Sequence, residues 1–277
     1  MAPHPAPHPA PRAAADPSPD PAPRAAPAPA PRPLTVVTGG SRGIGAAICV
    51  RLATDGHDIV LGYHTDSAAA ERVAEAVRKA GGWCLAVRAD SADPGDVDRL
   101  FDTAAQAAAQ DGRGPVTGLV NNAGVRGPVG RLADADPEGM RRALEVNFFG
   151  YLLCARRAVR DLAANGGGVI VNISSAAATL GGPGEYVHYA ASKAAVDGMT
   201  VGLAKEVASD GIRVACVAPG TVWTEFHADP QRPAQRAPGI PMGRAGQPEE
   251  IAGAVSWLMS ADASFATGTV MRVAGGI

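Results

Sequence analysis

The stretch Thr38-Gly39-Gly40-Ser41-Arg42-Gly43-Ile44-Gly45 decides the fold class of this 277-residue chain. It follows directly on a short apolar run and leads into Ala46–Thr54, which has helical spacing. A strand, a glycine-rich turn and a helix in this order form the part of a fold that binds the pyrophosphate of a dinucleotide. Gly39 permits a tight turn, Gly43 lets the backbone approach the anion, and Gly45 lets the helix pack on the strand. The helix N-terminus then presents free N–H groups to the ligand.

Short apolar runs recur along the chain and alternate with stretches of helical spacing, such as Ala68–Ala80, Val97–Ala109 and Glu249–Met259. Continuous apolar runs between helices are typical of parallel strands that are covered on both faces. The pattern therefore predicts an α/β fold: a doubly wound, seven-stranded parallel sheet with helices on both faces, of the Rossmann-like type. The seven predicted strands are Leu34–Thr38, Asp58–Gly62, Trp83–Val87, Val116–Val120, Val169–Ile173, Ile212–Val217 and Thr269–Val273.

Residues 1–33 differ in composition from the rest, because they hold 13 of the 24 prolines, mixed mainly with Ala. Pro fixes φ and lacks an N–H, and the segment has no large aliphatic or aromatic side chain for a core. We expect a disordered or polyproline-II-like tail, with a docking segment for a Pro-recognising partner as the alternative. The segment lacks the apolar centre of a secretory signal. Residues 34–277 are predicted to form a single dinucleotide-binding domain.

The formal net charge of −2 gives no electrostatic reason to expect a nucleic acid or an anionic membrane as partner. No apolar run approaches the roughly 18 residues of a membrane-spanning helix. The four cysteines are far apart, without a C-x-x-C pair, no acidic cluster occurs, and the H-x-x-x-H spacing at His4 and His8 lies within the Pro/Ala-rich segment. We therefore expect no disulfide framework and no metal site, and reduced thiols in a cytoplasmic protein.

From the glycine stretch to its last residue the chain resembles the short-chain dehydrogenase/reductase family. The spacing T-G-x-x-x-G-x-G is the ordinary form of that family, and Asn121-Asn122-Ala123-Gly124, Pro219-Gly220 and Ala274-Gly275-Gly276-Ile277 match its later motifs. Within the family, the glucose/sugar dehydrogenase-like and 3-oxoacyl-carrier-protein reductase-like members look closest. The resemblance implies a nicotinamide cofactor bound by Gly39, Ser41, Arg42, Gly43, Ile44, Gly45, Tyr63, His64, Asp90, Asn121, Ala123, Gly124, Tyr189, Lys193, Pro219, Gly220, Val222 and Thr224.

Tyr189 and Lys193 are four residues apart and therefore share one face of a helix. Hydride transfer to a carbonyl leaves an alkoxide that must be protonated, and the reverse reaction needs a base. Free Tyr has a pKa near 10, and we expect the Lys193 cation, at about 5 Å, to lower the pKa of Tyr189 by roughly two units. Tyr189 is thus the predicted general acid/base. Tyr186, which has no Lys four residues later, is expected on the substrate side.

The resemblance adds Ser175 and Asn147 to the predicted catalytic residues. A Ser at position 175 is implied to hydrogen-bond the reacting oxygen, with Ser174 as a backbone-capping neighbour. The spacing of 14 from Ser175 to Tyr189 is one more than in many members, and the extra residue falls within Gly184–His188. Asn147 matches a helical Asn whose displaced backbone carbonyl holds a water that links the Lys to solvent.

The end of the second predicted strand indicates the cofactor. An Asp there would bind the ribose 2′-OH and repel a 2′-phosphate, but the run reads Ile59-Val60-Leu61-Gly62-Tyr63-His64, and Asp66 is expected to cap the next helix. Arg42 is placed as the phosphate-binding arginines of NADP-preferring relatives are. These charges favour NADP(H), with NAD(H) as the alternative.

The variable stretch Thr221–Gly246 is expected to form a lid over a small-molecule substrate. The predicted function is hydride transfer between the cofactor and a ketone, aldehyde or secondary alcohol. The alternatives are a catalytically silent cofactor-sensing or scaffold protein, a non-redox dehydratase or epimerase, and a 3-oxoacyl-carrier-protein reductase. The last is weakened by the turn Ala163–Gly168, which lacks arginines for an acidic carrier, although Arg156, Arg157 and Arg160 lie upstream. The family also implies a homo-oligomer, a tetramer in the first place.

Overall fold

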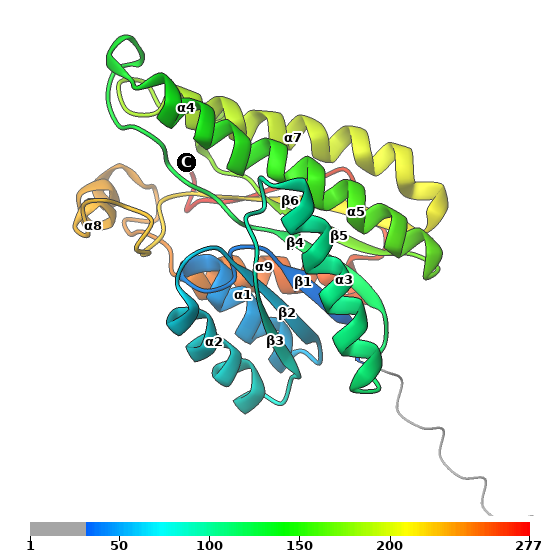
Figure 1. Ribbon diagram of the computed structural model, residues 1–277. Helices are drawn as coiled ribbons and strands as arrows, with labels where there is room; N and C mark the ends of the chain where they lie inside the picture. Colours follow the sequence, from blue (N-terminus) through cyan, green and yellow to red (C-terminus); the bar gives the residue numbers. More distant parts are fainter. Residues whose placement is uncertain (1–31) are drawn as a thin grey trace, which may run out of the picture. The chain divides into compact units, whose positions relative to one another are not determined.

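The computed structural model describes residues 32–277. Its seven strands form one sheet in the order β3-β2-β1-β4-β5-β6-β7, and every neighbouring pair is parallel (Figure 1). This confirms the predicted doubly wound sheet. The strands are β1 (Leu34–Val37), β2 (Asp58–Tyr63), β3 (Cys84–Arg88), β4 (Val116–Asn121), β5 (Gly168–Ile173), β6 (Ile212–Pro219) and β7 (Val270–Val273).

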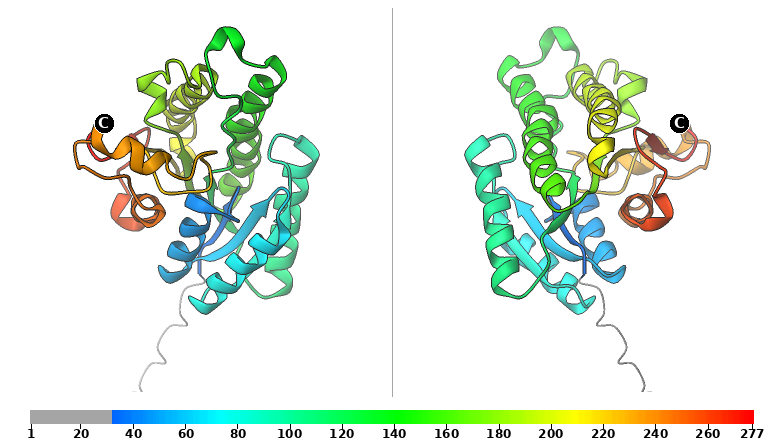
Figure 2. Two further views of the ribbon diagram at one scale, coloured as in Figure 1. Left: turned by 90° about the vertical axis from the view of Figure 1, so that its left-hand side faces the viewer. Right: turned by 90° about the vertical axis from the view of Figure 1, so that its right-hand side faces the viewer.

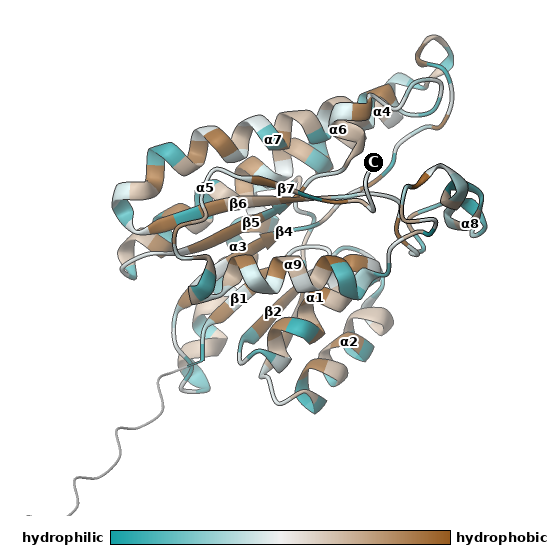
Figure 3. Ribbon diagram, turned by 180° about the vertical axis from the view of Figure 1, so that it is seen from behind, coloured by the Kyte–Doolittle hydropathy of each residue, from teal (hydrophilic) through white to brown (hydrophobic). Residues whose placement is uncertain are grey.

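Helices cover both faces of this sheet, which is why the inner strands are apolar throughout (Figures 2 and 3). One buried cluster joins the sheet to α1, α2 and α9, and a second joins its other face to α3, α5 and α7. The helices are α1 (Gly43–Thr54), α2 (Ser67–Lys79), α3 (Pro94–Gln110), α4 (Pro137–Leu144), α5 (Gly150–Ala164), α6 (Ala177–Leu180), α7 (Val187–Val207), α8 (Arg232–Arg236) and α9 (Pro248–Met259).

Local sequence signals fix several helix starts. The carboxylate of Asp66 accepts the Ala69 N–H at the start of α2, as expected, and Asp93 caps α3 in the same way. Pro94 stands at the first position of α3, where its missing N–H leaves no helical hydrogen bond unmade. These caps set the lengths of the loops that leave the carboxyl ends of the strands.

The order of the sheet reverses at β1, whose neighbours are β2 and β4. Loops that leave the two strands on either side of such a point turn in opposite directions and open a crevice at the carboxyl edge of the sheet. The glycine stretch follows β1 and Asn122-Ala123-Gly124 follows β4, so both border this crevice.

The predicted tail lies outside the described residues, except for Arg32 and Pro33. The guanidinium of Arg32 pairs with Asp58 at 3.1 Å and donates to the carbonyls of Ala53 and His57, while the Pro33 carbonyl accepts the Asp58 N–H. These two residues thus contact the amino end of β2.

The stretch between β6 and α9 contains α8 and runs beside the C-terminal residues, where the Met242 N–H donates to the Gly275 carbonyl (Figures 1 and 2). A parallel bridge between Val222 and Gly246 closes its base. Within residues 32–277, none of the helices is at once long and apolar enough to cross a membrane.

Candidate active site

The glycine loop is held in a conformation that other residues rarely adopt. Gly39 and Gly43 have φ of +63° and +51°, in the left-handed region that favours glycine. A Cβ on Gly45 would overlap the carbonyl oxygen of Gly39 and come within 2.5 Å of the Asn122 amide nitrogen. The Asn122 amide donates to the carbonyls of Thr38 and Gly39 at 3.0 Å, so it braces the loop from β4.

The start of α1 fits a phosphate group. Arg42 stands at the N-cap without a side-chain hydrogen bond to the helix, and the first turn holds no acidic residue. The first N–H groups of a helix have no partner within it and carry its positive dipole end, so an anion binds there favourably. The residues of this loop therefore fit the pyrophosphate of a dinucleotide cofactor.

A cavity of about 880 Å³ lies above the carboxyl edge of the sheet. The glycine loop lines one end, and Ser175, Tyr189 and Lys193 line its wall. Among the predicted cofactor residues it is also lined by Tyr63, His64, Asp90, Ala123, Gly124, Pro219, Gly220, Val222 and Thr224. Two predicted residues, Asn121 and Asn147, do not line it.

The assignment of Asn121 to the cofactor site is wrong for its side chain. Asn121 is the last residue of β4 and pairs in register with Asn172 of β5, so its amide points into the core. Its Nδ2 donates to the Asn172 amide oxygen at 3.0 Å and to the Tyr151 carbonyl at 3.3 Å. The next residue, Asn122, holds the glycine loop instead.

Tyr189 lies in the first turn of α7, beside two aromatic rings. Its ring lies 5.5 Å from that of Tyr186, edge to face, and 5.8 Å from that of Phe226. Ser175 lies two residues after β5 and accepts the Ala177 N–H at 3.1 Å. Ser174 donates to the backbone carbonyl of Lys193. The local capping contact therefore belongs to Ser175 rather than to its neighbour.

We expected a lowered pKa for Tyr189, but the side chains around it raise this pKa instead. Burial disfavours the phenolate and raises the pKa of Tyr189 to about 12, although the hydrogen bond with Ser175 acts in the opposite direction. The Nζ of Lys193 is 6.0 Å from the Tyr189 ring centroid and is already bound elsewhere. At neutral pH the phenol is therefore protonated and ready to donate.

Lys193 is completely enclosed beside Tyr151. Its Nζ donates to the Tyr151 hydroxyl at 3.1 Å and to the Ile173 carbonyl at 2.8 Å, and it lies 4.7 Å from the Tyr151 ring centroid. Burial lowers the pKa of Lys193 to about 8. The sequence did not indicate Tyr151 as a neighbour of Lys193. Its hydroxyl reaches Lys193 only through the packing of α5 beside β5.

Asn147 lies in a π-helical segment, η2 (Glu145–Phe149), between α4 and α5. Its side chain accepts the Val125 N–H and donates to the Val125 carbonyl, both at 2.8 Å, and it donates to Ser192 on α7. A π-bulge displaces backbone carbonyls from the helical hydrogen-bond ladder. The predicted role of Asn147, a displaced carbonyl that holds a water, requires such a feature. A Cβ on Gly124 would lie 3.4 Å from its amide oxygen and 3.9 Å from Nζ of Lys193.

Comparisons with known proteins agree with this site. A family model described as enoyl-(acyl carrier protein) reductase matches residues 39–277. The crystal structure of a short-chain type dehydrogenase/reductase from Mycobacterium marinum superposes with a TM-score of 0.81 at 32 % identity, over 88 % of this chain and 94 % of that one. The chain belongs to the short-chain dehydrogenase/reductase family. It is accordingly an oxidoreductase, as the motifs predicted.

Two curated relatives are similar over almost the whole family domain. The uncharacterized oxidoreductase YgfF of Escherichia coli is 44 % identical over 249 residues, which are 88 % of this chain and 99 % of that protein. The 3beta-hydroxysteroid dehydrogenase 1 of Eggerthella lenta is 40 % identical over 248 residues, which are 87 % and 92 % of the two chains. Both span the glycine loop and the Tyr–Lys pair because the matches cover most of residues 32–277.

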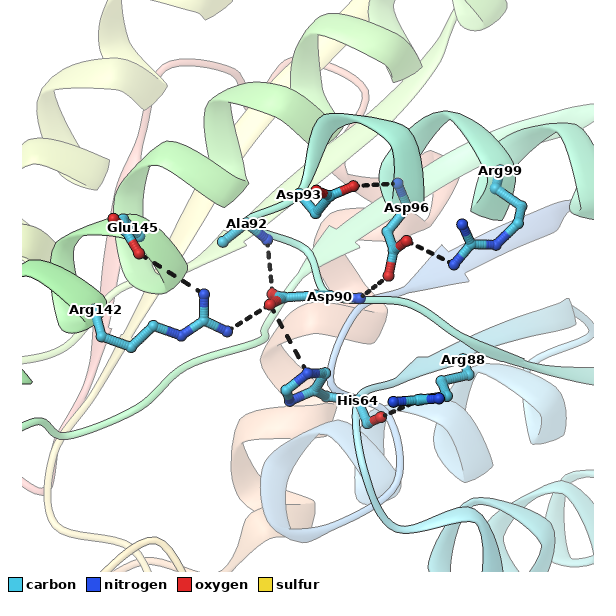
Figure 4. A network of polar contacts seen from close by, with 9 residues as sticks. All are labelled: His64, Arg88, Asp90, Ala92, Asp93, Asp96, Arg99, Arg142 and Glu145. Atoms are coloured by element: carbon cyan, nitrogen blue, oxygen red, sulfur yellow. Dashed lines mark hydrogen bonds and ion pairs between the residues drawn. The ribbon is translucent and has the colours of Figure 1, made fainter.

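In this short-chain dehydrogenase/reductase, Asp90 lines the cavity and is the centre of a polar network (Figure 4). Its carboxylate accepts the Ala92 N–H and binds Arg142 of α4 at 2.6 Å, while His64 lies 3.8 Å away. Burial raises the pKa of Asp90, but the Ala92 N–H and the Arg142 guanidinium outweigh it and hold the pKa below its ordinary value. Arg142, which the sequence did not single out, thus fixes Asp90 from across the crevice.

The substrate side contains a second cluster that sequence reasoning missed. Glu185, just before α7, binds Arg232 of α8 at 2.5 Å and also pairs with Arg236. Arg232 donates to the Tyr186 hydroxyl at 2.9 Å. The extra residue within Gly184–His188 indicated that the chain differs here from many family members. No local sequence pattern indicates that Glu185 binds Arg232, which is 47 residues away.

Proposed function

We propose that this protein transfers a hydride between NADP(H) and a ketone, aldehyde or secondary alcohol of a small or medium organic molecule, with Tyr189 as general acid/base. One observation carries the proposal: Ser175, Tyr189 and Lys193 line the same cavity as the glycine loop. A phenol that is protonated at neutral pH can donate its proton to a substrate oxygen as negative charge develops there. The nearby Ser hydroxyl and buried ammonium can stabilise that charge.

In this proposal the chain's own residues divide the work. A nicotinamide cofactor held by the glycine loop supplies or accepts the hydride. The Tyr189 hydroxyl donates a proton to the substrate oxygen in reduction and takes it back in oxidation. Ser175 hydrogen-bonds the same oxygen and Lys193 provides positive charge near Tyr189, while Phe226 and Tyr186 keep water away from the phenol.

The preference for NADP(H) is supported by the charges around the end of β2. Arg42 and His64 line the cavity with more than half of each side chain exposed, and the position after Gly62 is Tyr63 rather than an acid. Asp66, the nearest following carboxylate, is used to cap α2. Glu225 lies 4.0 Å from Arg42, which leaves the guanidinium only loosely paired. A 2′-phosphate could pair with the Arg42 guanidinium there.

The experiment that tests the function follows nicotinamide absorbance while the protein is mixed with panels of ketones, aldehydes, quinones, sugars and secondary alcohols, with NADP(H) and NAD(H) in parallel. We expect stoichiometric cofactor consumption with at least one carbonyl compound and faster turnover with NADPH. Binding of NADPH without turnover of any carbonyl or alcohol would favour a cofactor-sensing or scaffold protein. Product formation without cofactor consumption would favour a dehydratase or epimerase.

The arginines of α5 leave a carrier-protein substrate as the alternative. Arg157 is already paired with Asp98, Asp102 and Asp161, so its charge is not available to an acidic carrier. Arg156 and Arg160 are exposed and have no ion pair among residues 32–277.

Assembly and location belong to the same proposal. Phe149 and Leu152, near the start of α5, expose 46 % and 38 % of their surface, and Val201 on α7 exposes 37 %. Apolar faces on two long helices suit a homo-oligomer, a tetramer in the first place, which light scattering at micromolar concentration tests. The four cysteines are buried and unpaired, which suits the cytoplasm and is tested by cell fractionation.

A further inference from the structure

The substrate end of the cavity is lined by three guanidinium groups and one carboxylate: Arg126, Arg232, Arg236 and Glu185. Another carboxylate that lines the cavity nearby, that of Glu225, is opposite a different cation, Arg42. This end of the cavity therefore has more positive than negative charge.

Glu185 and Tyr186 hold the two arginines of α8, and all four residues line the cavity. Arg232 binds the Glu185 carboxylate at 2.5 Å and the Tyr186 hydroxyl at 2.9 Å, and Arg236 binds Glu185. Within the described chain, every hydrogen bond or ion pair from residues 228–239 to elements outside the 221–246 stretch ends on Glu185 or Tyr186. One carboxylate thus serves two guanidinium groups, both of which line the cavity.

The cluster is one aromatic ring away from the reacting phenol. The Arg232 guanidinium lies 5.5 Å from the Tyr186 ring centroid, and that ring lies 5.5 Å from the Tyr189 ring. A substrate whose carbonyl reaches Tyr189 would therefore extend its next substituent toward Arg232.

Two further observations indicate a positive field with spare donors. Burial lowers the pKa of His227, and the charges of Arg232 and Arg126 lower it further. The Nε of Arg126 is buried without a hydrogen-bond partner among residues 32–277, although its Nη1 donates to the Phe226 carbonyl. A guanidinium presents its donors in a planar fork that matches a carboxylate, so an anionic group would compensate both the charge and the donors.

We infer that Arg232, together with Arg236 and Arg126, determines substrate specificity by binding a carboxylate on the substrate. The substrate class is then an oxo acid or hydroxy acid whose carboxylate lies a few bonds from the reacting carbon. This inference rests on the proposed function for its reaction, but the charge recognition itself is testable without turnover. Glu185 sets its strength, because it neutralises one of the cations.

The direct test measures binding of benzoate and of benzamide, which have the same shape, to the NADP⁺-bound full-length protein by calorimetry. We expect benzoate to bind at least tenfold more tightly. Arg232→Gln and Arg236→Gln should each reduce this ratio at least fivefold, and Glu185→Gln should raise it. The ratio of the two ligands cancels a general loosening of α8. Arg72→Gln is the matched control, since Arg72 is exposed on α2 and has no ion pair in residues 32–277.

A turnover test separates this inference from the proposed function. Oxo acids whose carboxylate lies a few bonds from the carbonyl, paired with their methyl esters, should show a preference for the acid in kcat/KM that falls in the two arginine variants. If no carbonyl compound is turned over, the proposed function fails, and the benzoate measurement still decides the charge recognition. Equal binding of benzoate and benzamide, or a ratio unchanged in both arginine variants, would overturn the inference.

Discussion

The glycine loop at the cofactor end of the cavity is shaped by the backbone, whereas the substrate end is shaped by charged side chains that meet across long stretches of sequence. At the cofactor end, Gly39 and Gly43 adopt positive φ, and Gly45 leaves no room for a side chain. At the substrate end, Glu185 reaches arginines 47 and 51 residues later in the chain. Backbone geometry of this kind leaves a signature in local sequence, and a distant ion pair does not.

This difference has a functional consequence. A cofactor site built from backbone N–H groups can bind the same dinucleotide in many proteins, because it needs only glycine spacing and a helix start. A substrate site built from side chains can change its ligand through single substitutions. Tyr189 and Lys193 lie where the two ends meet, and substitutions there should have the largest effects.

Tyr189→Phe should lower kcat by about 10²–10⁴-fold while NADPH binding stays nearly unchanged. The substitution keeps the ring between Tyr186 and Phe226 but removes the proton donor, and general acid–base catalysis is worth about that factor. Steady-state kinetics and a cofactor titration measure the two effects. Tyr186→Phe is the matched control and should be mild. If Tyr189→Phe keeps more than about a tenth of kcat when chemistry limits turnover, the assignment of the acid/base is wrong.

Lys193→Met should stabilise the fold at neutral pH. Burial lowers the pKa of Lys193 from 10.5 in the unfolded chain to about 8. The folded protein therefore carries a penalty of about 3 kcal/mol that is fully present below pH 8 and fades as pH rises toward 10.5. Urea unfolding at pH 7 should show a gain of up to about that size, which shrinks across this interval.

The control for this substitution is Lys79→Met at the exposed end of α2, which should change the unfolding free energy little at any pH. A clear loss of stability for Lys193→Met at pH 7 would instead mean that the hydrogen bonds to Tyr151 and Ile173 outweigh the cost of burial.

The comparison of the two ends also explains which residues the sequence could predict. The glycine loop and the Tyr189–Lys193 pair depend on short spacings, and both were predicted at the residues that line the cavity. The choice between Asn121 and Asn122 depends on the register of β4 against β5, which a single strand does not reveal. The raised pKa of Tyr189 comes from burial beneath Phe226 and Tyr186, so it depends on how a distant stretch folds back.

Gly45→Ala tests the backbone design of the cofactor end. The new methyl group would overlap the Gly39 carbonyl, so the loop must shift; overpacking of this kind costs about 1–3 kcal/mol. We expect the affinity for NADPH to fall at least tenfold and the melting temperature to drop. Gly198→Ala is the matched control, since a Cβ there meets no atom within 4 Å and Ala is the better helix former. Equal behaviour of the two variants would contradict the role of Gly45.

Arg42→Asp and Tyr63→Asp should each move the preference toward NAD(H). A carboxylate near the 2′-phosphate costs about 1–3 kcal/mol, which is roughly a 5- to 150-fold change in the ratio of the two kcat/KM values. Glu225→Gln, which removes the carboxylate 4.0 Å from Arg42, should leave or slightly strengthen the preference for NADPH. A wild-type protein that already prefers NADH tenfold would show that the end of β2 was interpreted wrongly.

The smallest expected effect is the loss of stability when Arg32 is removed. The Arg32 side chain supports β2 by pairing with Asp58. Asp58, at the start of β2, is buried and is held by Arg32 at 3.1 Å and Arg113 at 3.4 Å. Removing residues 1–31 should leave the melting temperature and turnover unchanged, because that segment offers no core-forming side chain. Removing residues 1–33 should lower the unfolding free energy by about 1–2 kcal/mol. This deletion also removes the ion pair of Arg32 with Asp58 and the hydrogen bonds of Arg32 to the carbonyls of Ala53 and His57. Thermal unfolding of both truncations measures the difference. Equal stability of the two would mean that Arg113 and the Trp83 N–H satisfy Asp58 without Arg32. Destabilisation by the shorter deletion would mean that residues 1–31 contact the folded domain.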